Sequence, residues 1–267
     1  MYGQGTPASK GTSAEVKFIT RQAATRSVID RDLANLGGNP GQARMAKAES
    51  YMEAIKQKVQ ERIIYGASDG IGFPGLTHYY ASLTGANSSE NVITAGGSSG
   101  SQTSAFLVNS GDGKIFGEYP KSTPAGIDHL DLGNGGFIME SDGAGGTYPA
   151  FADEWRFNCG LAVEDWREGV RVCNIDVSDL NDNTAGYTEK VLRAMTKAHY
   201  RLPNGPGPSA FWQVPRFLAE HLHNGAVDRT KNGNLSIREF GGEHVTHFIG
   251  VPVRINDSIL VTESVVS

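Results

Sequence analysis

One long predicted helix constrains the fold of this sequence more than any other feature. Residues 40–65 follow Asn39, which is a favourable N-cap; Pro40 suits the first helical position, and Gly66 suits the residue that ends a helix. Apolar residues recur at spacings of three and four, which places one apolar stripe toward a core: Met45, Ala48, Met52, Ile55 and Val59. About 25 residues at 1.5 Å each give roughly 38 Å. This length predicts a spine helix across which other elements lie.

The rest of the sequence predicts strands and helices in irregular order. The clearest strand covers residues 151–163, whose apolar side chains occupy odd-numbered positions, so one face is expected to be buried. Hairpins are expected from 105–108 to 114–119 around NSGDG, and around 141–147. We also expect strands at 14–20 and 209–214, helices at 23–36, 184–202 and 215–223, and β-structure from Leu235 onward; residues 167–177 fit either type. The predicted fold class is therefore α+β.

The composition is that of a globular chain without a membrane span. Hydrophobic residues make up 39% and charged residues 20% of the 267, and the net charge is −5. That charge argues against binding nucleic acid through phosphate contacts. No run of 18 apolar residues occurs, and the first residues lack the apolar segment of a signal peptide. Two cysteines, Cys159 and Cys173, predict buried reduced thiols rather than a disulfide framework.

A possible catalytic motif lies at residues 96–100, where GGSSG matches the G-x-S-x-G pattern of a hydrolase nucleophile elbow with Ser98 as nucleophile. Such an elbow needs a strand before the serine and a helix directly after it. NVITA could be the strand, but SQTSAFLVN reads as a second strand. The triad order could be completed with Asp176 or Asp179 and His244 or His247, although seven histidines make that easy to satisfy. We therefore interpret GGSSG as a connecting loop and keep a serine hydrolase as the alternative.

The remaining motifs also lack the context that their chemistry requires. Residues 70–75 match G-x-G-x-x-G but follow a helix instead of a strand, so a turn explains them better than a nucleotide site. The histidine pairs have no zinc spacing, and the acidic groups suit turns or helix caps better than an EF-hand. These sets are His221 with His223, His244 with His247, Asp128 with Asp131, and Asp176 with Asp179 and Asp182. No catalytic residue, cofactor or metal is expected.

Several long segments resemble the major capsid proteins of tailed bacteriophages. They are KIFGEYPKSTPAGIDHLDLG (114–133), DEWRFNCGLAVEDWREGVRVCNIDVSDL (153–180) and LSIREFGGEHVTHFIGVPVRINDSILVTESVV (235–266). GQGTPASKGTSAEV and DRDLANLGGNPGQAR also have counterparts near the family's N-terminal third. The similarity runs in order over nearly the whole chain, and its specificity lies in length and collinearity.

The resemblance implies the Hong Kong 97-like capsid fold, with an N-terminal arm, an extended E-loop, a peripheral domain and an axial domain. It implies that residues 1–22 are an E-loop remnant, that 23–80 belong to the peripheral domain with the spine helix, and that 81–267 form the axial domain interleaved with the remaining peripheral strands. Family members carry a longer region before the counterpart of Gly3. We therefore expect a shortened or divergent relative that lacks the N-terminal arm and the first half of the E-loop.

The function implied by the resemblance is structural. Copies of the chain would assemble as hexamers and pentamers into an icosahedral shell around double-stranded phage DNA, without reading its sequence and without a membrane. The shell would form in the bacterial cytoplasm, with portal, scaffold and decoration proteins as possible partners. The expected contact residues are Lys10, Glu15, Lys17, Lys56, Lys58, Glu61, Arg62, Asp165, Trp166, Arg167 and Glu168. Besides the hydrolase, a monomeric binding module remains a third interpretation.

Overall fold

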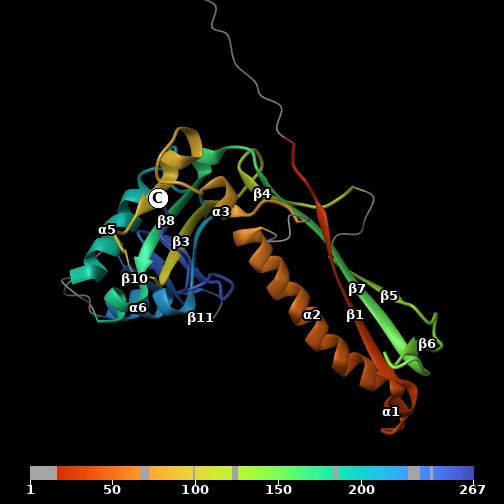
Figure 1. The fold of residues 1–267 in the computed structure, drawn as a ribbon. Coiled ribbons are helices and arrows are strands. Elements are labelled where there is room, and N and C mark those ends of the chain that lie inside the picture. Colours follow the sequence, from red (N-terminus) through yellow and green to blue (C-terminus); the bar gives the residue numbers. More distant parts are fainter. Residues whose placement is uncertain are drawn as a thin grey trace, which may run out of the picture.

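The structure, a computed structural model, describes residues 17–66, 72–98, 100–121, 126–182, 186–227, 235–240 and 243–267; for 225–227, 235–240, 243 and 244 it describes the backbone only. The described elements are β1 (Arg21–Asp30), α1 (Arg31–Asn35), α2 (Pro40–Tyr65), α3 (Leu76–Tyr79), η1 (Asn87–Asn91), β2 (Val92–Thr94), β3 (Gln102–Asn109), β4 (Ile115–Glu118), β5 (Ile127–Asp131), β6 (Ile138–Ser141), β7 (Thr147–Val163), η2 (Trp166–Glu168), β8 (Gly169–Asp176), α4 (Val177–Asn181), α5 (Tyr187–His199), β9 (Ala210–Val214), α6 (Arg216–Val227), β10 (Leu235–Phe240), β11 (Glu243–Phe248) and β12 (Val251–Ile255). They form an elongated arm, in which α2 lies beside β1 and β7, and a globular part (Figure 1).

The predicted spine helix is confirmed as α2. The Asn39 side chain accepts a hydrogen bond from the backbone N–H of Gln42, with 3.3 Å between the two atoms, and Gly66 ends the helix with a φ of +74°. Ile55 of the predicted stripe is buried, but Met45 is 74% exposed. Met45 is exposed because the start of α2 lies beside α1, at the end of the arm farthest from the globular part (Figure 1).

The segment before α2 differs from the prediction. Residues 17–20, the described part of the expected strand at 14–20, belong to no strand, and the expected helix at 23–36 is helical only over α1. Residues 21–30 instead form β1, which pairs antiparallel with β7 along its whole length. This pairing gives the backbone of β1 hydrogen-bond partners and buries Ala23 and Ile29, so tertiary pairing outweighs the helix-like spacing.

The long strand predicted at 151–163 is confirmed and organises the arm. It forms most of β7, which pairs antiparallel with β1, β4, β5 and β6. The turn predicted at 141–147 is also confirmed, because Ser141 lies opposite Thr147 where β6 meets β7. The expected single buried face is wrong for the end of β7. There Ala162 and Val163 are both buried, because this end of the strand enters the core between the two parts.

The globular part contains a seven-stranded sheet in the order β10-β11-β12-β9-β3-β8-β2. The predicted hairpin of β3 and β4 is wrong, because β3 pairs with β8 and β9 while β4 pairs with β7. The ambiguous residues 167–177 contain β8. The predicted helix at 184–202 is confirmed as α5, and the one at 215–223 as α6, which continues to Val227 across Asn224 and Gly225.

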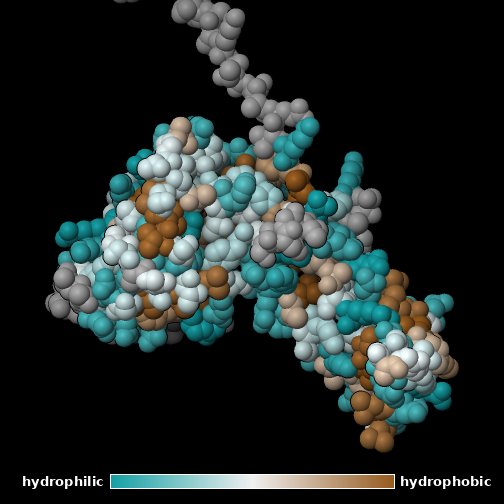
Figure 2. Space-filling view, viewed as in Figure 1, coloured by the Kyte–Doolittle hydropathy of each residue, from teal (hydrophilic) through white to brown (hydrophobic). Residues whose placement is uncertain are grey.

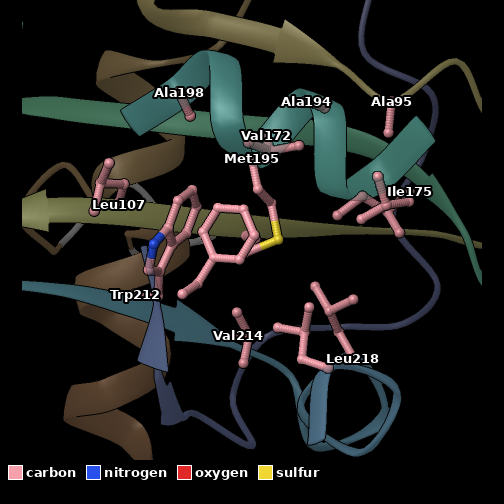
Figure 3. Packing of buried hydrophobic residues seen from close by; sticks show 14 of the residues in the cluster. Ala95, Leu107, Val172, Ile175, Ala194, Met195, Ala198, Trp212, Val214 and Leu218 are labelled. Atoms are coloured by element: carbon pink, nitrogen blue, oxygen red, sulfur yellow. The ribbon is translucent and has the colours of Figure 1, made fainter. Parts of the chain in front are cut away.

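Two hydrophobic cores hold these parts. One lies inside the globular part, where Met195 of α5 and Trp212 of β9 belong to the same buried cluster (Figure 3). The second, here called the junction core, contains residues from both parts: Ile64, Phe73, Leu76, Tyr80, Val92, Phe106, Val108, Ile115, Cys159, Leu161, Val163, Cys173 and Ile259. The arm therefore shares buried apolar surface with the globular part. Among the helices of the described ranges, none has the length and apolarity needed to cross a bilayer.

Candidate assembly surfaces

The GGSSG loop does not have the geometry of a nucleophile elbow. It connects β2 to β3, so a strand and not a helix follows Ser98. The Ser98 side chain is exposed and makes no hydrogen bond to another residue in the described part of the chain. Gly97 is required for packing, since a Cβ there would lie 2.3 Å from Gln102 Oε1 and 2.7 Å from the Asn174 carbonyl oxygen. The loop is a connection between strands in which Gly97 is closely packed.

The other motifs are also explained by packing and capping. A Cβ on Gly75 would lie 2.2 Å from the backbone N of Gly66, so this glycine allows two chain segments to approach closely. The Asp176 carboxylate accepts hydrogen bonds from two backbone N–H groups at the start of α4, which confirms the predicted cap. Both cysteines are buried, and burial raises the pKa of Cys173 to about 11. Within the described ranges, no three side chains are arranged to bind a metal ion.

Of the charged residues predicted on the spine helix, Lys56, Lys58 and Glu61 are exposed, whereas Arg62 is half-buried against β1. Lys56 Nζ lies 3.6 Å from a carboxylate oxygen of Glu53, and Lys58 Nζ lies 2.8 Å from one of Glu61. Arg62 donates a hydrogen bond to the backbone oxygen of Gln22 at 3.3 Å, so it holds β1 against α2. Lys17 is exposed, while Lys10 and Glu15 lie outside the described residues.

The predicted group at 165–168 is divided between surface and interior. Arg167 forms an ion pair with Asp165, with 2.7 Å between Nη2 and Oδ2, and its side chain is exposed. Trp166 is half-buried against the junction core. Glu168 is buried, and its carboxylate accepts a hydrogen bond from Asn109 Nδ2 at 2.5 Å.

A polar cluster on the arm was not predicted from the sequence. Arg44 of α2 donates to Asp153 of β7 at 2.6 Å and lies 2.8 Å from Asp131 of β5. His129 Nε2 lies 2.8 Å from Asp153, and its ring stacks on Trp155 with 4.1 Å between centroids. Burial would raise the pKa of Asp153, but its bonds to Arg44 and His129 outweigh this and lower it. The cluster holds α2 against the strands of the arm. In the sequence, its only sign was Arg44, which lies next to the apolar stripe of the predicted spine helix.

The far end of the arm exposes large apolar side chains. We call the following set the apolar tip: Leu33, Leu36, Met45, Phe137 and Met139. They come from α1, the start of α2 and the β6 region, which meet there because β6 and the end of β1 both pair with the start of β7. The Arg31 guanidinium covers the Phe137 ring at 5.1 Å, which joins α1 to this region. Figure 2 shows apolar residues gathered at this end of the arm.

Comparison with known proteins assigns the chain to a family. Residues 1–267 match the model of the family described as major capsid protein GP7. The chain belongs to the GP7 family of major capsid proteins. A chain in the near-atomic-resolution structure of bacteriophage epsilon15 is similar in fold to this GP7-family protein, with a TM-score of 0.68 and 26% sequence identity. The match covers 99% of this chain and 79% of the epsilon15 chain. No curated protein matches significantly.

The GP7 family assignment confirms the resemblance to phage major capsid proteins and the structural role that it implied. The mixed α+β fold is confirmed as well. Membership also implies self-assembly into a capsid shell. The serine hydrolase alternative finds no support in the family, in the epsilon15 similarity or in the loop that carries Ser98. The contact residues predicted from the sequence stay predictions.

Proposed function

We propose that copies of this chain assemble as hexamers and pentamers into a closed icosahedral shell around double-stranded phage DNA, with the apolar tip as one of the contacts between copies. The observation that supports this proposal is the exposure of the tip: Leu36 is 86% exposed and Met45 74%. Contiguous exposed apolar patches on soluble proteins mark interaction sites. Repeated over a closed lattice, even modest contacts hold a shell together.

The charged residues of the spine helix would add contacts that form at little cost. The Lys56–Glu53 and Lys58–Glu61 pairs are exposed, and helix pairs at this spacing contribute about 0.2–0.5 kcal/mol. Such residues can exchange their partners within the helix for charges on a neighbouring copy. The exposed side chains of Lys17 and Arg167 would also be available for such contacts, whereas Glu168 would first have to leave its buried partners.

The arm corresponds in this proposal to the peripheral domain of the Hong Kong 97-like fold and the globular part to its axial domain. A net charge of −5 suits a shell that encloses DNA without clamping it. Assembly would take place in the bacterial cytoplasm. Portal, scaffold and decoration proteins would bind the assembled lattice and not a pocket of one subunit.

The test is negative-stain electron microscopy of the purified protein beside its Leu36→Asp variant. We expect uniform shells or capsomer-like oligomers from the unchanged chain, and loss of shells from Leu36→Asp, because a carboxylate at the tip would be desolvated at a contact. Leu36→Met, which keeps an apolar side chain, is the matched control and should still assemble.

Circular dichroism of each variant shows whether the subunit itself folds. A side chain as exposed as Leu36 contributes little to the core, so all variants should keep their spectrum. A monomer from the unchanged chain would contradict the assembly proposal. Normal shells from Leu36→Asp would contradict the role of the tip.

A further inference from the structure

A C-terminal segment runs across the junction between the arm and the globular part. We call residues 256–267 the C-terminal strap. It leaves the globular part where the Asn256 N–H donates to the Val214 carbonyl oxygen at 2.9 Å. It then contributes Ile259 to the junction core. At its end, the Val266 N–H donates to Asn174 Oδ1 at 2.8 Å, which returns the strap to β8.

The middle of the strap carries a buried carboxylate held by three elements. Glu263 accepts hydrogen bonds from Tyr65 of α2 at 2.5 Å, from Ser104 of β3 at 2.5 Å and from Arg171 of β8 at 3.0 Å. The side chains of Glu263 and Arg171 are each only 6% exposed. Charge-assisted hydrogen bonds in such an environment are strong and depend on geometry.

Tyr65 is the one member of this group that belongs to the arm. It is the last residue of α2, and its hydroxyl both donates to Glu263 and accepts from the Leu260 N–H at 2.8 Å. Burial first, and the nearby Glu263 carboxylate second, raise the pKa of Tyr65 far above its usual range, so the hydroxyl keeps its proton. Both hydrogen bonds end on the strap.

The other bonds of the group lie within the globular part and the strap. Arg171 Nε donates to the Ser104 hydroxyl at 3.1 Å, and Arg171 Nη1 to the carbonyl oxygen of Tyr80 at 3.0 Å. The backbones of Gln102 and Glu263 exchange hydrogen bonds of 2.8 and 3.2 Å. The strap would therefore stay on β3 and β8 even if α2 were released.

We propose that the C-terminal strap, locked by the Glu263 carboxylate, sets the angle between the arm and the globular part. The junction core holds the two parts together, but apolar contact is non-directional and permits small rotations. The two bonds of the Tyr65 hydroxyl are directional and fix the end of α2 relative to β3 and β8. In a shell, this angle decides how neighbouring copies meet, a consequence that rests on the proposed function.

The test compares Tyr65→Phe with Ser104→Ala. Each variant removes one hydroxyl bonded to Glu263, but only Tyr65→Phe removes hydrogen bonds between the strap and the arm. The angle is read as a spin-label distance between cysteines introduced at Met45 on the arm and Tyr200 on the globular part, both exposed. The two native cysteines are buried and should remain unlabelled.

We expect a broadened or shifted distance distribution for Tyr65→Phe and an unchanged one for Ser104→Ala. Both variants should keep the circular dichroism spectrum of the folded protein. An unchanged distribution for Tyr65→Phe, or equal broadening in both variants, would overturn the proposal. Where shells form, their diameters should be more varied for Tyr65→Phe alone. If the unchanged chain forms no shells, the assembly proposal fails, while the distance measurement still decides the role of the strap.

Discussion

At the scale of the residue, two glycines of the GGSSG loop have opposite surroundings. Gly97 is buried against the backbone of Asn174 and the side chains of Gln102 and Asp176, while a Cβ on Gly100 would meet nothing within 4 Å. Substitutions at these two glycines therefore distinguish the cost in stability of a steric clash from the general effect on stability of replacing a glycine. Neither glycine needs a catalytic role to explain its place beside Ser98.

Gly97→Ala should lower the free energy of unfolding by about 1–3 kcal/mol, the usual cost of forcing an extra carbon into a packed site. Gly100→Ala should be neutral or slightly stabilising, because alanine restricts the unfolded chain. Urea unfolding of the two variants measures the difference. Equal stabilities would mean that the strands around Gly97 can move apart.

At the scale of the element, the attachment of α2 to the strands of the arm depends on the Arg44 cluster. The hydrogen bond from Arg44 is the main cause that lowers the pKa of Asp131. Arg44 and His129 together lower the pKa of Asp153, although burial of that carboxyl group acts to raise it. A carboxyl group with a lowered pKa in the folded state contributes stability that is complete above its ordinary pKa of 3.8. That contribution is lost as the pH falls from this value through the lower folded-state pKa.

Arg44→Met should therefore reduce stability at neutral pH by about 3 kcal/mol, because it leaves the carboxylate of Asp153 buried without its main partner. Its stability should also depend less on pH below about 4, since the pKa values return toward those of the unfolded chain. The measurement is urea unfolding across the acid range. Arg216→Met is the control: it breaks an exposed pair with Asp257 and should change the stability little, because exposed ion pairs are screened by solvent. A similar loss in both variants would contradict the role given to burial.

The elements also show how far the sequence could predict this fold. Caps and spacing predicted α2 and α5, because both helices carry a local signal at their ends or along one face. β1 was predicted as helix, because Val28, Ile29, Leu33 and Leu36 share a helical spacing and nothing local reveals the partner strand more than a hundred residues away. Leu33 and Leu36 looked like core residues for the same reason, although the structure exposes them. The function could be inferred only from the long segments that match the capsid family in order, since the residues at contacts between shell subunits follow no local sequence motif.

At the scale of the whole molecule, the arm is not an appendage of the globular part. The junction core takes Ile64 from the spine helix, Leu161 from β7 and Phe106 from β3, and the strap crosses the same region. Neither part can unfold without exposing this shared apolar surface. Loss of one part should therefore destabilise the other, and the unassembled subunit should unfold in one cooperative transition.

Calorimetry of the unassembled subunit tests this expectation. One peak is expected, with equal calorimetric and van't Hoff enthalpies. Ile64→Ala, at a position with 0% exposure, should lower the stability by roughly 2–5 kcal/mol and move the whole peak to lower temperature. The exposed Met45 on the same helix gives the control, because Met45→Ala should leave the peak in place. Two peaks, of which Ile64→Ala moves only one, would mean that the arm folds on its own and that the junction core does not couple it to the globular part.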